Sequence, residues 1–424
     1  MKTPALALTP RAVNRVRFAA ILGVLGPGLV SGFADNDAGG ISTYSVAGVR
    51  FGYDLLWVLL ASQIVLFFTQ EVGARLGLAT GQGLAGLVRE KYGVRWAAFM
   101  MSTMLVANVG SIIAEFAGCS AALGLVFGWP NWASALVAAI VVVLLLTRGN
   151  YSKVQYLFVA VGICVSTAYF ISALLARPDW GQAANSLVIP HLESNAGYWV
   201  AVVATVGTTI TPWGQAFIQS YVADKRLGPE DLVGERLDVG LGALLTNLIA
   251  AFIVVACAAT LWSTGATSAT DVATIARGLE HLAGPFTTVL FAVGLLAAAF
   301  LGLGVVPLTS AYAACEAFGW ETGVDWRWRE APAFYGLMIF FIVSAALFVV
   351  VVPYSGLVQV MFTAQVVNCL LLPFVLVFVM RLSADKELMG PLVSGRFLLT
   401  IGWLGTALLV VLSLTLVATS FMGF

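Results

Sequence analysis

Long apolar runs dominate this chain, and short polar segments separate them. A run of about 17 to 25 apolar residues can cross a bilayer as a helix. Such runs recur near 19–46, 54–76, 96–126, 131–147, 154–176, 198–222, 239–263, 284–315, 332–352, 354–380 and 397–421. The pattern predicts eleven transmembrane helices. No separate soluble domain is expected, because the longest polar connection holds only about twenty residues.

Two of these runs are interrupted in the middle by a polar segment that contains glycine. Residues 35–40 (Asp-Asn-Asp-Ala-Gly-Gly) break the first run, and residues 208–215 (Thr-Thr-Ile-Thr-Pro-Trp-Gly-Gln) break the sixth. Unwound backbone at membrane depth is tolerated only where it is buried in protein or lines a cavity. Broken helices in corresponding positions of two halves are typical of the substrate site of a transporter. Asp37 in the first break indicates a cationic substrate.

The two breaks also divide the chain. Each opens a set of five runs, and because five is odd the second set enters the membrane from the opposite side. We expect an all-α polytopic membrane protein with two inverted five-helix repeats, the LeuT/APC-type fold, in which broken helices one and six form the site. The expected parts are a cytoplasmic N-terminal segment (1–18) and a transporter domain (19–424), which comprises repeat one (about 19–176), repeat two (about 198–380) and an extra helix (about 397–421).

Composition and charge agree with this picture. Of the 424 residues, 60% are hydrophobic and 10% charged, against roughly 25% charged in soluble domains. With eleven spans and a cytoplasmic N-terminus, 18 of the 21 Lys and Arg residues fall on the inner side, and only Arg50, Arg177 and Arg277 fall outside. The positive-inside rule therefore predicts a plasma-membrane protein with an external C-terminus. The net charge of zero and the lack of a basic cluster give no sign of nucleic acid.

Signatures of enzymes are missing from the sequence. There is no Ser-His-Asp set, no His-Glu-x-x-His motif and no Cys/His metal spacing, and the only histidines, His191 and His281, fall in predicted external loops. The cysteines lie in or beside apolar runs and are expected to be small packing residues: Cys119, Cys164, Cys257, Cys315 and Cys369. We expect a transporter rather than an enzyme, without a cofactor. An amino-acid carrier of the same fold is an alternative, although Asp37 would repel the carboxylate of its substrate unless it paired with the amine.

Several segments resemble the NRAMP family of divalent-metal transporters. Gly-Pro-Gly at 26–28, the segment around Asp37 and Phe-Gly-Tyr-Asp-Leu-Leu-Trp-Val-Leu-Leu at 51–60 are similar to its first two helices. Ala-Glu-Phe-Ala-Gly at 114–118 resembles its third helix. Arg-Pro-Asp-Trp at 177–180 and Thr-Pro-Trp at 211–213 fit its fifth-to-sixth loop and sixth helix. The similarity runs from about residue 20 to 380, and it implies the same fold and a metal-ion substrate.

The chain departs from the family pattern in both breaks. The family motif Asp-Pro-Gly-Asn is here Asp-Ala-Gly-Gly at 37–40, so the acid is kept while the amide ligand is replaced by Gly40. Met-Pro-His is here Thr-Pro-Trp at 211–213, and a second family histidine falls at Ile218. A soft sulfur ligand favours transition metals, and Thr211 does not supply one. Mg²⁺ usually keeps several waters beside one or two carboxylates. These traits resemble the NRAMP-related magnesium transporters.

By this resemblance, the metal ligands are expected to be Asp37, the backbone carbonyl of Thr208, and Thr211. Other polar residues should line the site or its aqueous path: Asp35, Asn36, Gly40, Glu115, Trp213, Gln215 and Gln365. Two of these remain open. Asp35 is either a second charge of the vestibule or an external residue that solubilises the break. Glu115 is either a remote acid of the aqueous path or a buried, hydrogen-bonded structural carboxyl.

The lost histidines bear on coupling, because histidine titrates near neutral pH and can relay protons, whereas Trp213 cannot. The expected function is uptake of Mg²⁺ (and Mn²⁺) down the electrochemical gradient without obligatory proton coupling. A membrane potential of 100 mV supplies roughly 4.6 kcal/mol for a divalent ion. The alternative is a proton-coupled Mn²⁺/Fe²⁺ transporter of the usual NRAMP type, with a relay rebuilt from Asp35 and Glu115. The ion is the substrate, the bilayer is the surrounding partner, and no protein partner is implied.

Overall fold

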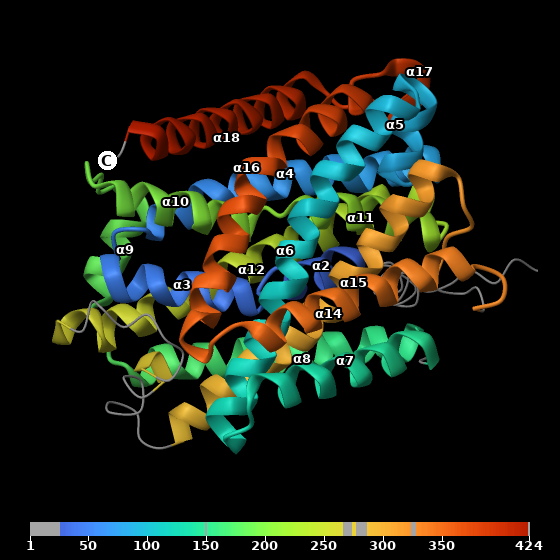
Figure 1. Ribbon diagram of the computed structural model, residues 1–424. Coiled ribbons are helices and arrows are strands. Elements are labelled where there is room, and N and C mark those ends of the chain that lie inside the picture. The colour runs from blue at the N-terminus through green and yellow to red at the C-terminus, as the bar shows by residue number, and fades with distance from the viewer. Residues whose placement is uncertain (1–25, 149–150, 266–273, 277–285, 324–327, 423–424) are drawn as a thin grey trace, which may run out of the picture.

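The computed structural model describes residues 26–148, 151–265, 274–276, 286–323 and 328–422, which form a bundle of helices without a strand (Figure 1). The predictions for residues 1–18, Arg277, His281 and Arg327 lie outside the described residues. Figure 1 shows α18 along one edge of the bundle and α7 at the opposite edge, with α6 and α12 between them. The helices are α2 (Pro27–Ala34), α3 (Ala38–Phe51), α4 (Leu56–Thr80), α5 (Leu84–Tyr92), α6 (Val94–Phe127), α7 (Asn131–Arg148), α8 (Tyr151–Leu175), α9 (Trp180–Val188), α10 (Ala196–Thr209), α11 (Pro212–Asp224), α12 (Leu232–Thr260), α14 (Phe286–Phe318), α15 (Pro332–Val351), α16 (Leu357–Ser383), α17 (Lys386–Met389) and α18 (Arg396–Met422).

Within the described residues, seven helices are long and apolar enough to cross a membrane: α4, α6, α12, α14, α15, α16 and α18. Shorter apolar stretches lie in α7 (Asn131–Thr147) and α8 (Gly162–Leu175). The two broken runs appear as the pairs α2/α3 and α10/α11, whose halves hold 8 and 14, and 14 and 13 residues. Half-helices of this length cannot span a bilayer singly. The total of eleven crossings therefore stays a prediction.

Both predicted breaks are present but shorter than expected: only residues 35–37 and 210–211 lie outside the helices. Local chemistry explains where each second half begins. Asp37 adopts an extended backbone before α3, and its carboxylate accepts a hydrogen bond from the Gly40 amide. Thr211 does the same before α11, where its hydroxyl accepts from the Gly214 amide at 3.1 Å. Asp and Thr are favoured at such N-caps, because their oxygens satisfy amides that lack a helical partner. Pro212 follows at the first helical position, where a missing N–H costs nothing.

Helix α2 lies against α12 at backbone contact distance. A Cβ added at Gly32 would lie 2.5 Å from the Gly242 carbonyl oxygen, and one at Gly242 would lie 2.1 Å from that of Gly28. At the start of α2, the Asp238 carboxylate accepts from the Gly28 amide. At its end, the Thr246 hydroxyl donates to the Gly32 carbonyl at 2.7 Å. Small residues that let helices approach closely are typical of membrane bundles, and here they fasten the first half-helix to α12.

Basic residues gather at one end of the bundle, which we call the basic end and define by Arg89, Lys91, Lys225 and Arg226. Arg89 lies across a cavity from the last turn of α11, which Lys225 and Arg226 follow. Burial lowers the pKa of Lys225, against the opposing influence of acids on α12. The ammonium of Lys91 contacts the Asp385 carboxylate at 2.5 Å and holds its pKa below the usual range.

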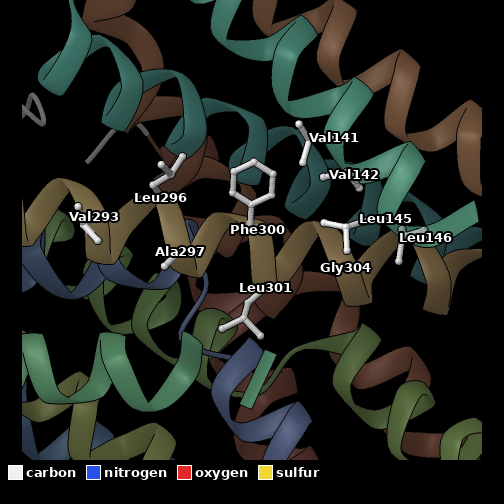
Figure 2. Close-up of a pocket in the computed structure, with 10 residues that line it drawn as sticks. All are labelled: Val141, Val142, Leu145, Leu146, Val293, Leu296, Ala297, Phe300, Leu301 and Gly304. Carbon is white, nitrogen blue, oxygen red and sulfur yellow. The ribbon is translucent and has the colours of Figure 1, made fainter. Parts of the chain in front are cut away.

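An apolar groove of about 310 Å³ lies between α7 and α14, and Figure 2 shows the side chains that line it. Val141 and Val142 of α7 stand on one side, and Phe300 and Leu301 of α14 on the other. None of its lining side chains is polar, so the groove offers nothing to an ion and suits contact with lipid. Four of the five cysteines are buried, as expected for packing residues, whereas Cys164 on α8 is exposed.

Candidate metal site

The candidate site is centred on Asp37, which is fully buried at the start of α3. Its Oδ1 accepts a hydrogen bond from the Gly40 amide at 2.5 Å. Its Oδ2 accepts from no N–H or O–H donor of the described residues. Leaving a buried carboxylate oxygen unpaired is costly. Asp37 can therefore cap the helix and still offer an oxygen to a cation.

Glu115 of α6 lies beside the first break rather than at a distance from it. It is fully buried, and its Oε2 accepts from the Ala38 amide at 3.1 Å. The carboxyl groups of Glu115 and Asp37 approach closely enough for a proton to join them in a hydrogen bond. Gly302 of α14 makes room for this arrangement, since a Cβ there would lie 2.5 Å from the carboxyl carbon of Glu115. Two carboxylates thus meet at one helix end.

Gly40 lies close to oxygen atoms on several sides. A Cβ at this position would lie 3.0 Å from Thr208 Oγ1, 3.2 Å from the Asp35 carbonyl oxygen and 3.2 Å from Asp37 Oδ1. Thr208 is fully buried in the last turn of α10, where backbone carbonyls lack helical partners. The two breaks therefore meet at Gly40, where hard oxygen donors from both lie close together.

Asp35 belongs to the interior and not to an external face. It is fully buried, and its Oδ1 accepts from the Thr211 hydroxyl at 3.2 Å. Its Oδ2 accepts from Gln70 Nε2 at 3.3 Å, and the same amide donates to Ser31 Oγ at 3.2 Å. Thr211 is thus held by Asp35 and by its capping bond, and Asp35 joins the two breaks. Gln70 was not predicted as a site residue, although an amide side chain inside the second apolar run could have indicated it.

The remaining predicted residues surround the breaks. Asn36 Nδ2 donates to the Thr246 carbonyl at 3.2 Å, which ties the first break to α12. Gln365 of α16 accepts from Asn368 at 2.7 Å through Oε1, and its Nε2 would lie 2.0 Å from a Cβ at Gly39. Gln365 therefore crosses the first turn of α3.

Trp213 and Gln215 lie on the first turn of α11. Trp213 is among the largest fully buried side chains, and its ring lies 6.5 Å from that of Phe217. Neither amide atom of the buried Gln215 is paired within the described residues. Trp213 therefore forms a wall, whereas Gln215 retains unused hydrogen-bonding capacity.

The acidic side chains at the breaks have no basic partner. Across the described ranges, no Lys, Arg or His lies within ion-pair distance of Asp35, Asp37 or Glu115. In the same part of the chain no group of three or more His, Cys, Asp and Glu side chains is arranged to hold a metal. A cation bound here would use oxygen donors of a few residues together with water.

Comparison with known proteins decides the family. The model for natural resistance-associated macrophage protein-like proteins (Nramp) matches residues 28–419. The chain belongs to the Nramp family. Its relatives include the "Divalent metal cation transporter MntH" of Deinococcus radiodurans, 29% identical over 95% of this chain and 90% of that protein. The protein of the same description from Bacillus subtilis is 26% identical over 95% and 94%.

Solved structures confirm the predicted fold of this Nramp protein. The Eremococcus coleocola manganese transporter, in complex with an aromatic bis-isothiourea compound, superposes with a TM-score of 0.77 at 20% identity, covering 99% of this chain and 90% of that one. MhsT in complex with L-phenylalanine gives 0.63 at 14% identity over 93% and 98%. The all-helical architecture with two broken helices is therefore the LeuT type.

The family resemblance inferred from the sequence is thus confirmed, and the departures at the Nramp site can be placed. Thr211 caps α11 and bonds Asp35, where the family pattern has a methionine. Trp213 is buried where the pattern has a histidine, and Ile218 is buried in the same helix. His191 is 70% exposed, far from a buried site. Neither position 211 nor position 213 supplies sulfur or imidazole to the breaks.

Proposed function

We propose that this Nramp protein carries divalent metal cations across the plasma membrane, with Mg²⁺ as the preferred ion and Mn²⁺ as a second substrate. Its relatives from Deinococcus and Bacillus are described as divalent metal cation transporters. The proposed ligands are Asp37, the Thr208 carbonyl and Thr211. The proposed orientation places the basic end in the cytoplasm.

The observation that carries the proposal is the cluster of oxygen atoms around Gly40. Thr208 Oγ1, the Asp35 carbonyl and Asp37 Oδ1 surround the position that a side chain would occupy. Mg²⁺ gives up its waters reluctantly and favours hard oxygen ligands at 2.0–2.1 Å. A donor set of oxygens, without an amide at position 40 or a thioether at position 211, suits a hard ion that retains part of its hydration. When both are ionised, Asp37 and Glu115 together supply two negative charges that a divalent ion balances.

Transport without obligatory proton coupling is the second part of the proposal. Trp213 and Ile218 cannot titrate, so the family's histidine positions cannot relay protons here. The membrane potential is a sufficient source of energy for inward movement of a divalent ion. One observation favours the alternative of proton-coupled Mn²⁺/Fe²⁺ transport: the contact between Glu115 and Asp37 would let an arriving ion displace a shared proton.

Ion uptake into proteoliposomes tests both parts. Mg²⁺ and Mn²⁺ are offered separately while an internal dye reports pH. Mg²⁺ uptake without acidification, absent from Asp37→Ala, is the expected result. Mn²⁺ uptake with acidification and indifference to Mg²⁺ would instead establish the proton-coupled alternative.

A further inference from the structure

Two glutamines of α11 carry buried amide atoms that have no hydrogen-bond partner in the described part of the chain. Gln215 is fully buried, and neither Oε1 nor Nε2 is paired. Gln219 is also fully buried; its Nε2 donates to the Gln82 carbonyl at 3.0 Å, while its Oε1 accepts from no donor. Buried amide groups are normally paired, with water where protein donors are lacking. These two side chains therefore indicate a hydrated space beside α11.

The glutamines lie between the breaks and the basic end. Thr211 caps α11 at the second break, and Gln215 and Gln219 follow at successive steps of four residues. Residues four apart share a helix face and are separated by about 6 Å along the axis. The helix ends at Asp224 beside Lys225. The unpaired amides thus mark one side of the helix that leads away from the ion site.

A polar cavity of about 360 Å³ opens at the basic end, between the α4–α5 turn, α11 and α14. Gln82, whose carbonyl holds Gln219, belongs to its lining. Three lining carboxylates, Asp224, Glu316 and Glu321, outnumber the one lining arginine. Such a surplus of negative charge in a recess raises the local concentration of cations.

The cavity is suited to passage rather than to tight binding. Glu316 accepts from the Ser220 hydroxyl at 2.8 Å and from backbone amides of the first turn of α5. Asp224 accepts from the Tyr312 hydroxyl at 2.9 Å. Both carboxylates already have donors, so they attract a cation without being arranged to chelate it.

We propose that the divalent ion, together with its remaining waters, travels between the breaks and the cytoplasm along the Gln215–Gln219 side of α11 and through this cavity. The inference rests on the proposed function, because it names the route of that ion. Amide oxygens accept hydrogen bonds from the ion's waters, and amide nitrogens donate to neighbouring water. A hydrated Mg²⁺ could therefore pass without shedding its shell.

Two substitutions of Gln219 test the route. Leucine keeps the bulk but forms no hydrogen bond, so Gln219→Leu is expected to lower the initial rate of Mg²⁺ and Mn²⁺ uptake by about tenfold. Mn²⁺ binding measured in detergent should stay unchanged, because the ligands at the breaks are untouched. Gln219→Ser loses the bond to Gln82 but keeps a small polar group, and is expected to retain most of the rate. If both variants lose the uptake rate equally, the only role of Gln219 is its hydrogen bond to the α4–α5 turn, and the proposed route is wrong.

The matched control is Gln359→Leu, which makes the same change at an exposed position of α16 and should leave uptake at the wild-type rate. A wild-type rate in Gln219→Leu would also overturn the proposal. If the wild-type protein takes up neither ion, the proposed function fails, and the route is then decided by labelling Gln219→Cys with a membrane-impermeant thiol reagent. Modification of residue 219 from the basic end, located by mass spectrometry, supports a wetted route, and its absence rejects one.

Discussion

Glu115 lies against Asp37, far from it in the sequence. It accepts a hydrogen bond from the amide of Ala38, which is 77 residues away along the chain. The two carboxylates accept hydrogen bonds from different free amides at the start of α3. The Ala38 amide donates to Glu115, and the Gly40 amide donates to Asp37. Helix starts are electropositive and tolerate one negative charge well. A second carboxylate at the same place creates repulsion that a proton or a cation relieves. The contact therefore gives the first break a demand for positive charge, which a proton or a cation can meet.

Asp37→Asn should separate the charge of this residue from its capping role. Asparagine caps a helix as well as aspartate does, so the start of α3 is preserved. Loss of the charge is expected to weaken Mn²⁺ binding by about 10- to 100-fold, because charged partners contribute about 1.5–3 kcal/mol. Titration calorimetry in detergent measures the affinity. Asp179→Asn, at the exposed N-cap of α9, is the matched control and should bind like the wild type.

Gly40→Asn should shift selectivity from Mg²⁺ towards Mn²⁺. The new Cβ would lie 3.0 Å from Thr208 Oγ1, and the amide would compete with the ion's waters. The ratio of Mn²⁺ to Mg²⁺ uptake is expected to rise about tenfold, since Mg²⁺ dehydrates reluctantly. Gly40→Ala adds bulk without an amide and should slow both ions together. An unchanged ratio of Mn²⁺ to Mg²⁺ uptake in Gly40→Asn would contradict the role assigned to Gly40.

Thr211→Met should add a soft ligand at a structural cost. The sulfur is expected to confer Cd²⁺ binding that the wild type lacks, because thioethers select soft metals. The same change removes the cap on the Gly214 amide and the donor to Asp35, so the free energy of unfolding should fall by about 1 kcal/mol. Competition between Cd²⁺ and Mn²⁺ and thermal melting report the two effects. Thr211→Ser keeps both bonds and should show neither.

Gly242→Ala should destabilise the bundle by forcing α2 away from α12. Its Cβ would lie 2.1 Å from the Gly28 carbonyl oxygen, and overpacking of this kind costs about 1–3 kcal/mol. Thermal unfolding in detergent measures the change. Gly336→Ala, in α15 where nothing lies within 4 Å of the added Cβ, should be neutral or slightly stabilising. Similar melting temperatures for the two variants would show that α2 is free to shift.

The sequence predicted those features that the membrane itself enforces. Apolar runs must be helical in a bilayer, and a carboxylate such as Asp37 is tolerated only at a functional break. Both breaks and the lost ligands at Gly40 and Thr211 could therefore be found without coordinates. The number of crossings could not be settled by helix length, because half-helices such as α2, with 8 residues, fall below the length of a span.

Contacts that depend on how the helices cross could not be predicted from the sequence. Glu115 meets Asp37 only because Gly302 lets α6 and α14 approach the break, and no local pattern reports such a triple contact. Gln70 bonds Asp35 from α4, a helix that the hydropathy pattern treats as uniformly apolar. Polar residues within apolar runs were visible, but their partners depend on the tertiary arrangement.

The glycine contact between α2 and α12 has a mechanical consequence. Because Gly28 and Gly32 touch the backbone at Gly242, with Asp238 and Thr246 fastening the two ends of α2, we expect α2 to move together with α12. Any such movement relative to α3 would bend the chain at the non-helical residues from Asp35 to Asp37, which lie between α2 and α3. A cation bound at Asp37 would therefore lie at the joint between α3 and the α2/α12 pair, so that its binding and the angle between these helices would depend on each other.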